Sequence, residues 1–330
     1  MFDNKIQVEN NSSRAGFYID RKIAGGFTGF GKLELGTNLV RNNTAFNPDA
    51  AAKIFEAKQR PQFDPLIVHV ADRTQLATVV TALTSTAQQL IDQFWPGPLT
   101  LVLPKQLTMP DLVTAGLETV AVRMPNHPVA HALIREAGTP IAAPSANPFG
   151  YVSPTTAQHV ADGLGSMIDL ILDGGPCPVG VESTIVSLVG SQAELLRPGS
   201  ITLEQLSAVI GPVRRSSSVI DQPTAPGQLA RHYATQTPVK ILPFDKTRPT
   251  LQHNERAGLL IFSPANATDE RFAAIEVLSP TGDLREAAHH LFAALRRLDA
   301  QGLDRIYVEP CREEGLGVAI MDRLRRCAAL

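Results

Sequence analysis

The chain has 330 residues, which is more than one ordinary core holds, so two domains are expected. Apolar residues make up 44% of the chain and charged residues 19%, which is the composition of a globular protein. The net charge of -2 excludes attraction to nucleic acid or to anionic membranes through overall charge, so any anion site must be local.

The cysteines and the apolar pattern indicate where the protein works. Cys177, Cys311 and Cys327 are scattered and lack the C-x-x-C spacing of zinc or redox sites, which favours a reducing compartment with idle thiols. No run of about 18 apolar residues occurs, and the polar N-terminus lacks the apolar centre of a signal peptide. We therefore expect a cytoplasmic protein that does not enter a membrane.

The first predicted element is a helix over residues 47–60. Asn47 can cap it, Pro48 suits its first position, and Pro61 follows its end. Short apolar runs with the composition of strands come next, at residues 66–70, 99–103, 120–124, 140–143, 170–173 and 184–189. Helical stretches such as 86–94 lie between some of them. The pattern predicts an α/β domain with a sheet covered on both faces, and it leaves parallel or mixed pairing open.

The composition changes near residue 212. The stretch that follows is rich in Ser, Pro, Gly and Thr and lacks periodicity, as an interdomain linker would. Strand candidates then occur at residues 239–244, 258–262, 276–278 and 304–309. An amphipathic helix over 283–301 carries an apolar stripe of Leu284, Ala288, Leu291, Leu295 and Leu298. The predicted division is a first domain over residues 1–212, a linker over 213–236 and a smaller α/β domain over 237–330.

Several familiar site motifs are absent or incomplete. The chain has no G-x-x-x-x-G-K-[ST] loop and no G-x-G-x-x-G, so a nucleotide would be bound by another design. His127 and His131 have i, i+4 spacing, but no H-E-x-x-H glutamate accompanies them and Pro128 opens the helix. This favours a surface or capping role over a metal site. His289 and His290 lie on the amphipathic helix, where a structural role is expected.

Four cations stand where the chain turns. Lys58 and Arg60 leave the end of the first helix, Arg123 ends a strand, and Arg197 ends another. Each of them could be a solvated surface charge, and cations at a helix end also offset its dipole. Because Arg offers a bidentate fork and Lys a point charge, the four together indicate a site for phosphate or carboxylate.

Small polar groups occupy similar places. Ser145 and Asn147 follow an apolar strand, Ser153 lies in the loop beyond, and Ser183 begins another strand. Turn and capping roles are the alternative for each. Open α/β sheets bind ligands at strand ends, so these groups would form a pocket if the fold brings them together.

These residues lie in ordered blocks that resemble a known family. The blocks are KIFEAKQRP, PLIVHV, FWPGPLTLVL, TAGLETVAVRMPNHP, PIAAPSAN, SPTTAQHV, VGVESTIVSL and LLRPGSIT. In order and spacing they resemble the YrdC-like family of threonylcarbamoyl-AMP synthases. That family's signature pairs K-x-R with S-x-N, here Lys58/Arg60 and Ser145/Asn147. The segments APGQLARHYA and GLGVAIMDRLRRCA are similar to its longer members, so the resemblance runs from about residue 45 to the end of the chain.

The resemblance implies a fold and an activity. The fold would be a twisted YrdC-like α/β domain with a central mixed sheet, followed by a smaller Rossmann-like α/β domain. The activity would be that of a nucleotidyltransferase that joins L-threonine, bicarbonate or CO₂, and ATP into threonylcarbamoyl-AMP and pyrophosphate, with Mg²⁺ bridging the phosphates. The product would feed the threonylcarbamoyl modification of adenosine 37 in tRNAs that read ANN codons, through a downstream transfer machinery. The family has also been associated with double-stranded RNA binding.

The resemblance also implies roles for particular residues. The catalytic residues would be Lys58, Arg60, Ser145 and Asn147. ATP would contact Lys58, Arg60, Asp64, Thr119, Ser145, Ser153, Arg197 and Tyr233. Threonine would contact Thr37, His69, Arg123, Ala143 and Ser183. Arg123 would clamp the threonine carboxylate and Tyr233 would form part of a lid. Without the resemblance, His69 would be expected to be a core histidine.

Residues 20–44 depart from the family pattern. A P-T-E-T-V-Y-G-L-G-like segment is replaced by ELGTNLVRNN, in which Thr37 matches the second threonine and both glycines are lost, and with them a tight backbone. Asp64 stands where Asn is usual, which would weaken phosphate binding unless Mg²⁺ or Arg60 compensates. Gln228-Leu229-Ala230 stand in place of a Met-Lys-Tyr-like run.

Two alternatives to an active synthase follow. One is a catalytically weakened RNA-binding or regulatory relative that keeps the basic cavity and loses the threonine pocket. The other is a carbamoyl-transfer module like that of hydrogenase maturation proteins. It ranks low because the acylphosphatase and zinc-finger segments that accompany the module there are absent from this sequence.

Overall fold

The structure is a computed structural model that describes residues 44–216, 223–245, 247–263 and 269–329, and the backbone of three strands nearer the N-terminus. Those strands are β1 (Gln7–Asn11), β2 (Arg14–Tyr18) and β3 (Lys32–Leu33). They form an antiparallel sheet in that order. Thr37 and most of the divergent stretch 20–44 lie outside the described residues.

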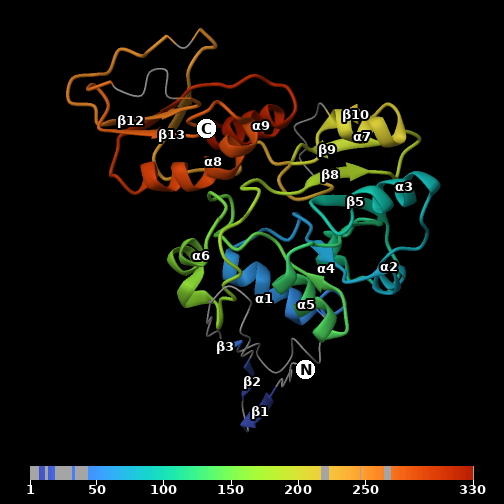
Figure 1. The fold of residues 1–330 in the computed structure, drawn as a ribbon. Coiled ribbons are helices and arrows are strands. Elements are labelled where there is room, and N and C mark those ends of the chain that lie inside the picture. The colour runs from blue at the N-terminus through green and yellow to red at the C-terminus, as the bar shows by residue number, and fades with distance from the viewer. Residues whose placement is uncertain are drawn as a thin grey trace, which may run out of the picture.

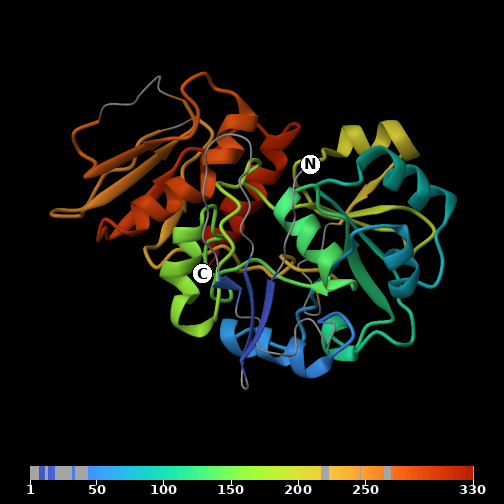
Figure 2. The same cartoon turned by 60° about the horizontal axis from the view of Figure 1, so that its bottom comes forward.

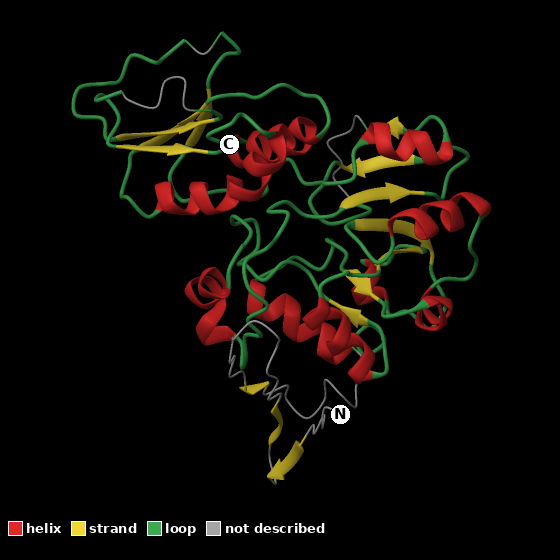
Figure 3. Ribbon diagram, viewed as in Figure 1, coloured by secondary structure: helices red, strands yellow, loops and turns green. Residues whose placement is uncertain are grey.

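The first body, residues 44–216, is built on a seven-stranded sheet (Figures 1 and 3). In sheet order its strands are β10 (Arg214–Arg215), β9 (Glu194–Arg197), β8 (Thr184–Ser187), β5 (Leu99–Pro104), β6 (Thr119–Arg123), β4 (Ile67–His69) and β7 (Ile141–Ala142). The pairs β10–β9, β8–β5 and β6–β4 run parallel, and the other three pairs run antiparallel. The mixed sheet expected from the resemblance is confirmed.

Helices connect these strands. They are α1 (Pro48–Lys58), α2 (Arg73–Val79), α3 (Ser85–Phe94), α4 (Asp111–Thr114), α5 (Pro128–Ala137), α6 (Ala157–Leu164), the 3-10 turn η1 (Gly165–Met167) and α7 (Leu203–Ile210). α1 begins as predicted, because the Asn47 side chain accepts hydrogen bonds from two backbone N–H groups at 2.9 and 3.3 Å. It ends at Gln59, whose left-handed φ of 53° turns the chain toward Arg60.

Side-chain alternation along β5 separates two apolar layers. Leu99, Leu101 and Leu103 belong to the main core, which α2, α3 and α7 cover. Val102 points to the opposite face and joins a smaller apolar cluster of Ile67, Val102, Ala121, Ile185, Leu196 and Ala225. Ala225 belongs to the connecting segment, residues 223–238, which therefore covers part of this second face. The strands are apolar on both sides because both faces are covered.

The second body, residues 239–329, contains an open parallel sheet with two helices. In sheet order the strands are β11 (Val239–Ile241), β14 (Arg305–Val308), β12 (Ala257–Ile261) and β13 (Ala274–Val277). α8 (Leu284–Asp299) and α9 (Leu316–Ala328) pack on one face of it. The predicted stripe on α8 is confirmed, since Ala288, Leu291, Leu295 and Leu298 are no more than 1% exposed. The sheet is parallel, as expected of a Rossmann-like unit, but its strand order differs from that of the Rossmann fold.

The two bodies lie side by side, with α8 and α9 on the side of the second body that faces the first (Figures 1 and 2). Hydrogen bonds cross this boundary from both helices. On α8, Arg296 donates to the backbone carbonyls of Val152 and Ser153. On α9, Arg326 donates to the carbonyls of the connecting segment at Gln228 and Leu229. The helices of the second body therefore anchor loops of the first.

One expectation from the sequence needs correction. Residues 170–173 do not form a strand, because none of the four is buried and the run lies on the surface between η1 and β8. The connecting segment between the two bodies is packed rather than solvated, since Gln228, His232 and Tyr233 are buried in it. The first sheet also extends to β10, beyond residue 212, where the first domain was expected to end. The exact domain limits stay a prediction.

Among the described residues, no helix has the length and apolar character needed to cross a membrane.

Candidate functional site

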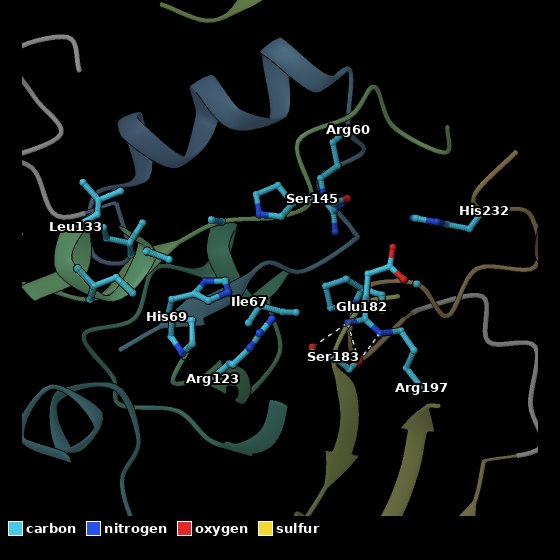
Figure 4. A pocket seen from close by; sticks show the side chains of 18 of the residues that line it. Arg60, Ile67, His69, Arg123, Leu133, Ser145, Glu182, Ser183, Arg197 and His232 are labelled. Carbon is cyan, nitrogen blue, oxygen red and sulfur yellow. Dashed lines mark hydrogen bonds between the residues drawn. The ribbon is translucent and has the colours of Figure 1, made fainter. Parts of the chain in front are cut away.

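A cavity of about 310 Å³ lies where strand ends of the first body meet the connecting segment (Figure 4). Its charged and polar lining consists of Arg60, His69, Arg123, Ser145, Glu182, Ser183, Arg197, His232 and Tyr233. Eight of the site residues named from the sequence line it, namely Arg60, His69, Arg123, Ala143, Ser145, Ser183, Arg197 and Tyr233. The fold therefore brings most of the predicted groups together, although they are far apart in the chain.

Arg197, at the end of β9, ties three parts of the wall together. Its Nε and Nη2 donate to the carbonyl of Ser183 at 3.1 and 2.9 Å, and Nη2 also donates to the Ser183 hydroxyl at 3.0 Å. Its Nη1 donates to the carbonyl of Pro226 in the connecting segment at 3.1 Å. The same Ser183 hydroxyl lies 2.8 Å from the hydroxyl of Thr100 on β5. Arg197 is 4% exposed, and burial lowers the pKa of its guanidinium.

Gly227 allows the connecting segment to approach Arg197 this closely. Its φ of +81° is in the left-handed region that side chains rarely adopt. A Cβ atom at this position would lie 2.6 Å from the Tyr233 hydroxyl and 3.1 Å from the Arg197 Cδ. Only glycine fits here without displacing the wall of the cavity.

Arg60 enters the cavity from the turn after α1. Its Nη2 forms an ion pair with the carboxylate of Asp64 at 2.9 Å, and it donates to the carbonyls of Asp64 and Pro65 at 3.1 and 2.8 Å. Burial raises the pKa of Asp64 to about 6, while Arg60 opposes that rise. Arg60 thus supplies the compensation that an aspartate at this position was expected to need.

Lys58 explains why K-x-R and S-x-N occur together. Its amine donates to the backbone carbonyls of both Ser145, at 2.6 Å, and Asn147. Burial and the charge of Arg60 lower the pKa of this amine to about 7. Lys58 does not line the cavity, and through these hydrogen bonds it holds the loop that carries Ser145. Ser145 itself lies at the cavity (Figure 4).

Asn147 and Ser153 lie behind the wall. The amide of Asn147 donates to the carbonyls of Pro148 and Tyr151 at 3.1 and 2.8 Å, which shapes the turn after β7. The hydroxyl of Ser153 donates to the carboxylate of Glu182. Both residues are buried and neither lines the cavity. The contacts with ligand that the resemblance implies for them stay predictions.

Arg123 and His69 occupy adjacent strand ends on the other side of the cavity. They are paired in the register of β4 and β6, and Arg123 Nε donates to the carbonyl of Gly97 at 3.0 Å. Burial, with Arg197 adding repulsion, lowers the pKa of Arg123 to about 10, so it stays charged. Burial lowers the pKa of His69 to about 4, so the imidazole is neutral, and its Nδ1 has no hydrogen-bond partner among the described residues.

The connecting segment closes the cavity with His232 and Tyr233. Tyr233 is 1% exposed, and its ring packs 4.1 Å from that of His232 and 5.5 Å from that of Phe292 on α8. Burial raises the pKa of Tyr233 to about 12, so its hydroxyl stays protonated at neutral pH. Tyr233 therefore joins the cavity wall to the second body, and its role as part of a lid stays a prediction.

Thr119 is a predicted site residue that does not reach the cavity. It begins β6, at the opposite end of that strand from Arg123, and is not part of the lining. It lies on the same face of β6 as Ala121 and Arg123, because side chains alternate along a strand. Its role in binding ATP stays a prediction.

Glu182 and His232 line the cavity but were not identified from the sequence. Glu182 stands directly before Ser183 in GVESTIV, and a site expected to hold phosphates gave no reason to look for a carboxylate. His232 stands directly before Tyr233, in a segment whose composition predicts a linker. Position beside a named site residue was the available signal in both cases.

The described residues offer no dedicated metal site. Nowhere among them are three His, Cys, Asp or Glu side chains grouped so that they could hold a metal ion. Ring nitrogens of His127 and His131 instead lie 3.2 and 2.9 Å from the backbone carbonyls of Gly174 and Ala71. The two carboxylates nearest the cavity, Asp64 and Glu182, are paired with arginines. This donor set fits Mg²⁺ only when substrate phosphates and water supply most of its ligands.

Comparison with known proteins covers nearly the whole chain. The family described as "Telomere recombination" matches residues 43–199, and the family described as "Threonylcarbamoyl-AMP synthase, C-terminal domain" matches residues 201–329. The threonylcarbamoyl-AMP synthase of Pyrococcus abyssi is 41% identical over 93% of both chains. That of Bacillus subtilis is 44% identical over 86% of this chain and 85% of its own.

Solved structures agree with the sequence matches. The crystal structure of P. abyssi Sua5 complexed with L-threonine is 39% identical, with a TM-score of 0.80 over 91% of this chain and 87% of that one. A second structure, of a P. abyssi Sua5 variant with two alanine substitutions, has a TM-score of 0.79 at 36% identity and covers 96% of this chain and 87% of its own. The chain therefore belongs to the threonylcarbamoyl-AMP synthase family and has the two-domain form of its longer members.

Proposed function

We propose that this chain is an L-threonylcarbamoyladenylate synthase, a nucleotidyltransferase that makes threonylcarbamoyl-AMP and pyrophosphate from L-threonine, bicarbonate or CO₂, and ATP. The relatives that match most of its length carry the name threonylcarbamoyl-AMP synthase. The P. abyssi structure in complex with L-threonine has the same fold, which supports threonine as a substrate here.

The observation that carries this proposal is the gathering of Arg60, Arg123 and Arg197 around one cavity. Arg60 is paired with Asp64, but Arg123 and Arg197 make no ion pair with any residue that the structure describes, and their hydrogen bonds go to carbonyls and a hydroxyl. Uncompensated guanidinium groups in a low-dielectric site favour anionic ligands. A carboxylate and a polyphosphate would supply the missing charge.

The phosphates would lie between Arg60 and Arg197. A carbamate, formed from the threonine amine and CO₂, attacks the α-phosphorus with its oxygen, while the bond to the β-phosphate oxygen breaks and pyrophosphate leaves. Negative charge grows on the leaving group, so fixed cations lower the barrier. Lys58 and Ser145 support this step, since Lys58 holds the loop that presents the Ser145 hydroxyl.

The amino acid would lie at the other end of the cavity. Arg123 offers a bidentate fork for its carboxylate, beside the neutral imidazole of His69 and the hydroxyl of Ser183. The resemblance implies that His69, which lines the cavity, contacts threonine. Tyr233 would keep water from the mixed anhydride, which otherwise hydrolyses.

Several features rest on the resemblance alone. Mg²⁺ would arrive with ATP and be held mainly by its phosphates. The product would pass, in the cytoplasm, to the machinery that modifies adenosine 37 of ANN-decoding tRNA, and RNA binding belongs to the same set of expectations. Thr37, Ala143 and Thr119 keep their proposed contacts with threonine or ATP on this basis.

The test is threonine-dependent pyrophosphate release. Purified protein with ATP, Mg²⁺ and bicarbonate should form pyrophosphate and threonylcarbamoyl-AMP when L-threonine is added, and neither product when it is omitted. A rate that does not change on omission of threonine would reject the synthase.

The weakened RNA-binding relative is not favoured as an alternative. It was suggested by the divergent stretch 20–44, whereas the described cavity keeps the arginines and hydroxyls expected of the synthase. Identity to the named synthases of 41% and 44% also extends over most of the chain.

A further inference from the structure

Arg323 is a fully buried arginine on α9 that reaches from the second body into the wall of the first. Its side chain is 0% exposed. Its Nε donates to the Glu182 carboxylate at 2.8 Å, and its Nη1 donates to the carbonyl of Pro198 at 2.9 Å. Nη1 also donates to Asp322, its neighbour on the helix, at 2.7 Å. Arg323 thus holds Glu182, the residue before Ser183, and Pro198, the residue after Arg197.

Glu182 connects Arg323 with the wall of the cavity. One of its oxygens accepts from Arg323 and the other accepts from the Ser153 hydroxyl, so the carboxylate is held at both ends. Its backbone is packed against Gly199, where a Cβ atom would come within 2.6 Å of the Glu182 carbonyl. Glu182 lines the cavity and lies directly before Ser183, so its placement fixes the start of β8.

Arg323 also supports the connecting segment. The centre of its guanidinium lies 5.1 Å from the centroid of the Tyr233 ring, in a cation–π contact that aligns Tyr233 over the cavity. The ring also packs against Phe292 of α8. A single side chain of the second body therefore touches three pieces of the wall, carried by Glu182, Pro198 and Tyr233.

A contact that served only to hold the bodies together would not need this geometry. Removing a charge from water is costly, and apolar residues of similar size often stabilise a buried interface equally well. On the same helix, Arg325 pairs with Glu313 at the surface, where such a pair contributes little. The buried pair with Glu182 instead keeps one carboxylate ionised and in one orientation beside the cavity.

We propose that Arg323 is a positioning residue for the reaction, which acts from the second body by orienting Glu182 and, through it, the Ser153 hydroxyl and the backbone that leads into Ser183. This inference rests on the proposed function. It assigns to α9 a specific task in catalysis by the first body. Arg323 itself does not line the cavity.

The charge of Glu182 gives the inference a distinctive signal. The titratable groups that interact with Glu182 are Arg323 from α9, Arg197 from β9, His232 and Tyr233 from the connecting segment, and Cys177 from the loop before β8. Asp322 on α9 is paired with Arg323, and Arg60 lines the same cavity. Burial alone would raise the pKa of Glu182, and Arg323 is the largest of the influences that hold it below its usual range. Without Arg323 the pKa of Glu182 will rise, so its carboxyl group will stay protonated to higher pH. A protonated carboxyl group donates a hydrogen bond, whereas the carboxylate of Glu182 only accepts them.

The experiment compares the pH dependence of threonine-dependent pyrophosphate release between about pH 6 and about pH 8. Arg323→Met should lower kcat by about tenfold or more and should gain an acid limb in addition to the pH dependence that the unaltered protein has from Asp64 and Lys58. The double variant Arg323→Met/Glu182→Gln should lose this limb, because the titrating carboxyl is gone, while its kcat stays low. Arg325→Met, from the exposed pair on the same helix, should keep both kcat and the pH profile.

Other outcomes separate the possibilities. Arg323→Met with unchanged kcat and pH profile, or persistence of the added acid limb in the double variant, would overturn the inference. If Arg323→Met fails to fold, Arg323→Lys and the double variant are used for the test. Arg323→Lys keeps a positive charge beside Glu182, and the double variant leaves no unpaired carboxylate at position 182. A synthase that is positioned as proposed recovers part of its kcat in Arg323→Lys. An unaltered protein without threonine-dependent activity contradicts the proposed function instead.

Discussion

Arg60 and Asp64 allow stability and catalysis to be separated. Arg60→Met leaves Asp64, which is 0% exposed, without its cation. Breaking a buried ion pair from one side costs about 3–5 kcal/mol of unfolding free energy, so loss of activity in this variant alone would be ambiguous. In the double variant Arg60→Met/Asp64→Asn no charge remains unpaired, and the unfolding free energy should return to within about 1–2 kcal/mol of the unaltered value.

The double variant should regain unfolding free energy but not catalytic activity. If Arg60 binds phosphate charge that grows as pyrophosphate leaves, the double variant should still lose about 100- to 1,000-fold in kcat for pyrophosphate release. Denaturant unfolding measures the first quantity and steady-state kinetics the second. The exposed pair of Arg73 and Asp92, altered in the same way to Met and Asn, is the matched control and should change neither. A folded Arg60→Met/Asp64→Asn variant with kcat close to the unaltered value would refute the role of Arg60.

Three further predictions concern other parts of the site. The pKa of Asp64 is raised to about 6, so its proton favours the folded state at about pH 4 and this contribution is lost as the pH rises through about 6. Asp64→Asn should therefore gain unfolding free energy relative to the unaltered chain, by up to about 3 kcal/mol, between about pH 4 and about pH 7. If urea titrations show that the difference in unfolding free energy between Asp64→Asn and the unaltered chain does not vary with pH, Asp64 is not ionised in a buried site. Arg123→Lys keeps the charge but loses the bidentate fork, so the KM for threonine should rise about tenfold while that for ATP stays constant, and an equal rise in both would count against a carboxylate clamp. Gly227→Ala would place a methyl group 2.6 Å from the Tyr233 hydroxyl, whereas Gly282→Ala, at a similar φ of +77°, meets open space. Only the first should lower kcat by more than about tenfold, and equal kinetics for the two variants would show that Tyr233 need not be held there.

Much of the fold could be predicted from local patterns. Asn47 and the residues after it specify the start of α1, and the apolar stripe of α8 is present in the sequence at helical spacing. The run 170–173 does not form a strand because its three apolar residues can do so only when a neighbouring strand is there to pair with them. Pairing partners are a property of the whole sheet.

The site could be predicted in its members more than in their arrangement. Lys58 was expected to hold phosphate, and the structure places its amine on the carbonyls of Ser145 and Asn147. Nothing local to Lys58 reveals this, because the carbonyls belong to residues far along the chain. Glu182 and Arg323 could not be predicted as site residues for the same reason, because their ion pair forms only when the second body packs against the first. A single sequence does not reveal ion pairs between residues that are far apart in the chain.

The most direct measurement is a structure of this chain in complex with L-threonine, ATP and Mg²⁺. We expect the threonine carboxylate on the guanidinium of Arg123 and the phosphates between Arg60 and Arg197, in the cavity that these three residues line. Threonine bound elsewhere, or phosphates that leave Arg60 and Arg197 without contact, would contradict the proposed site.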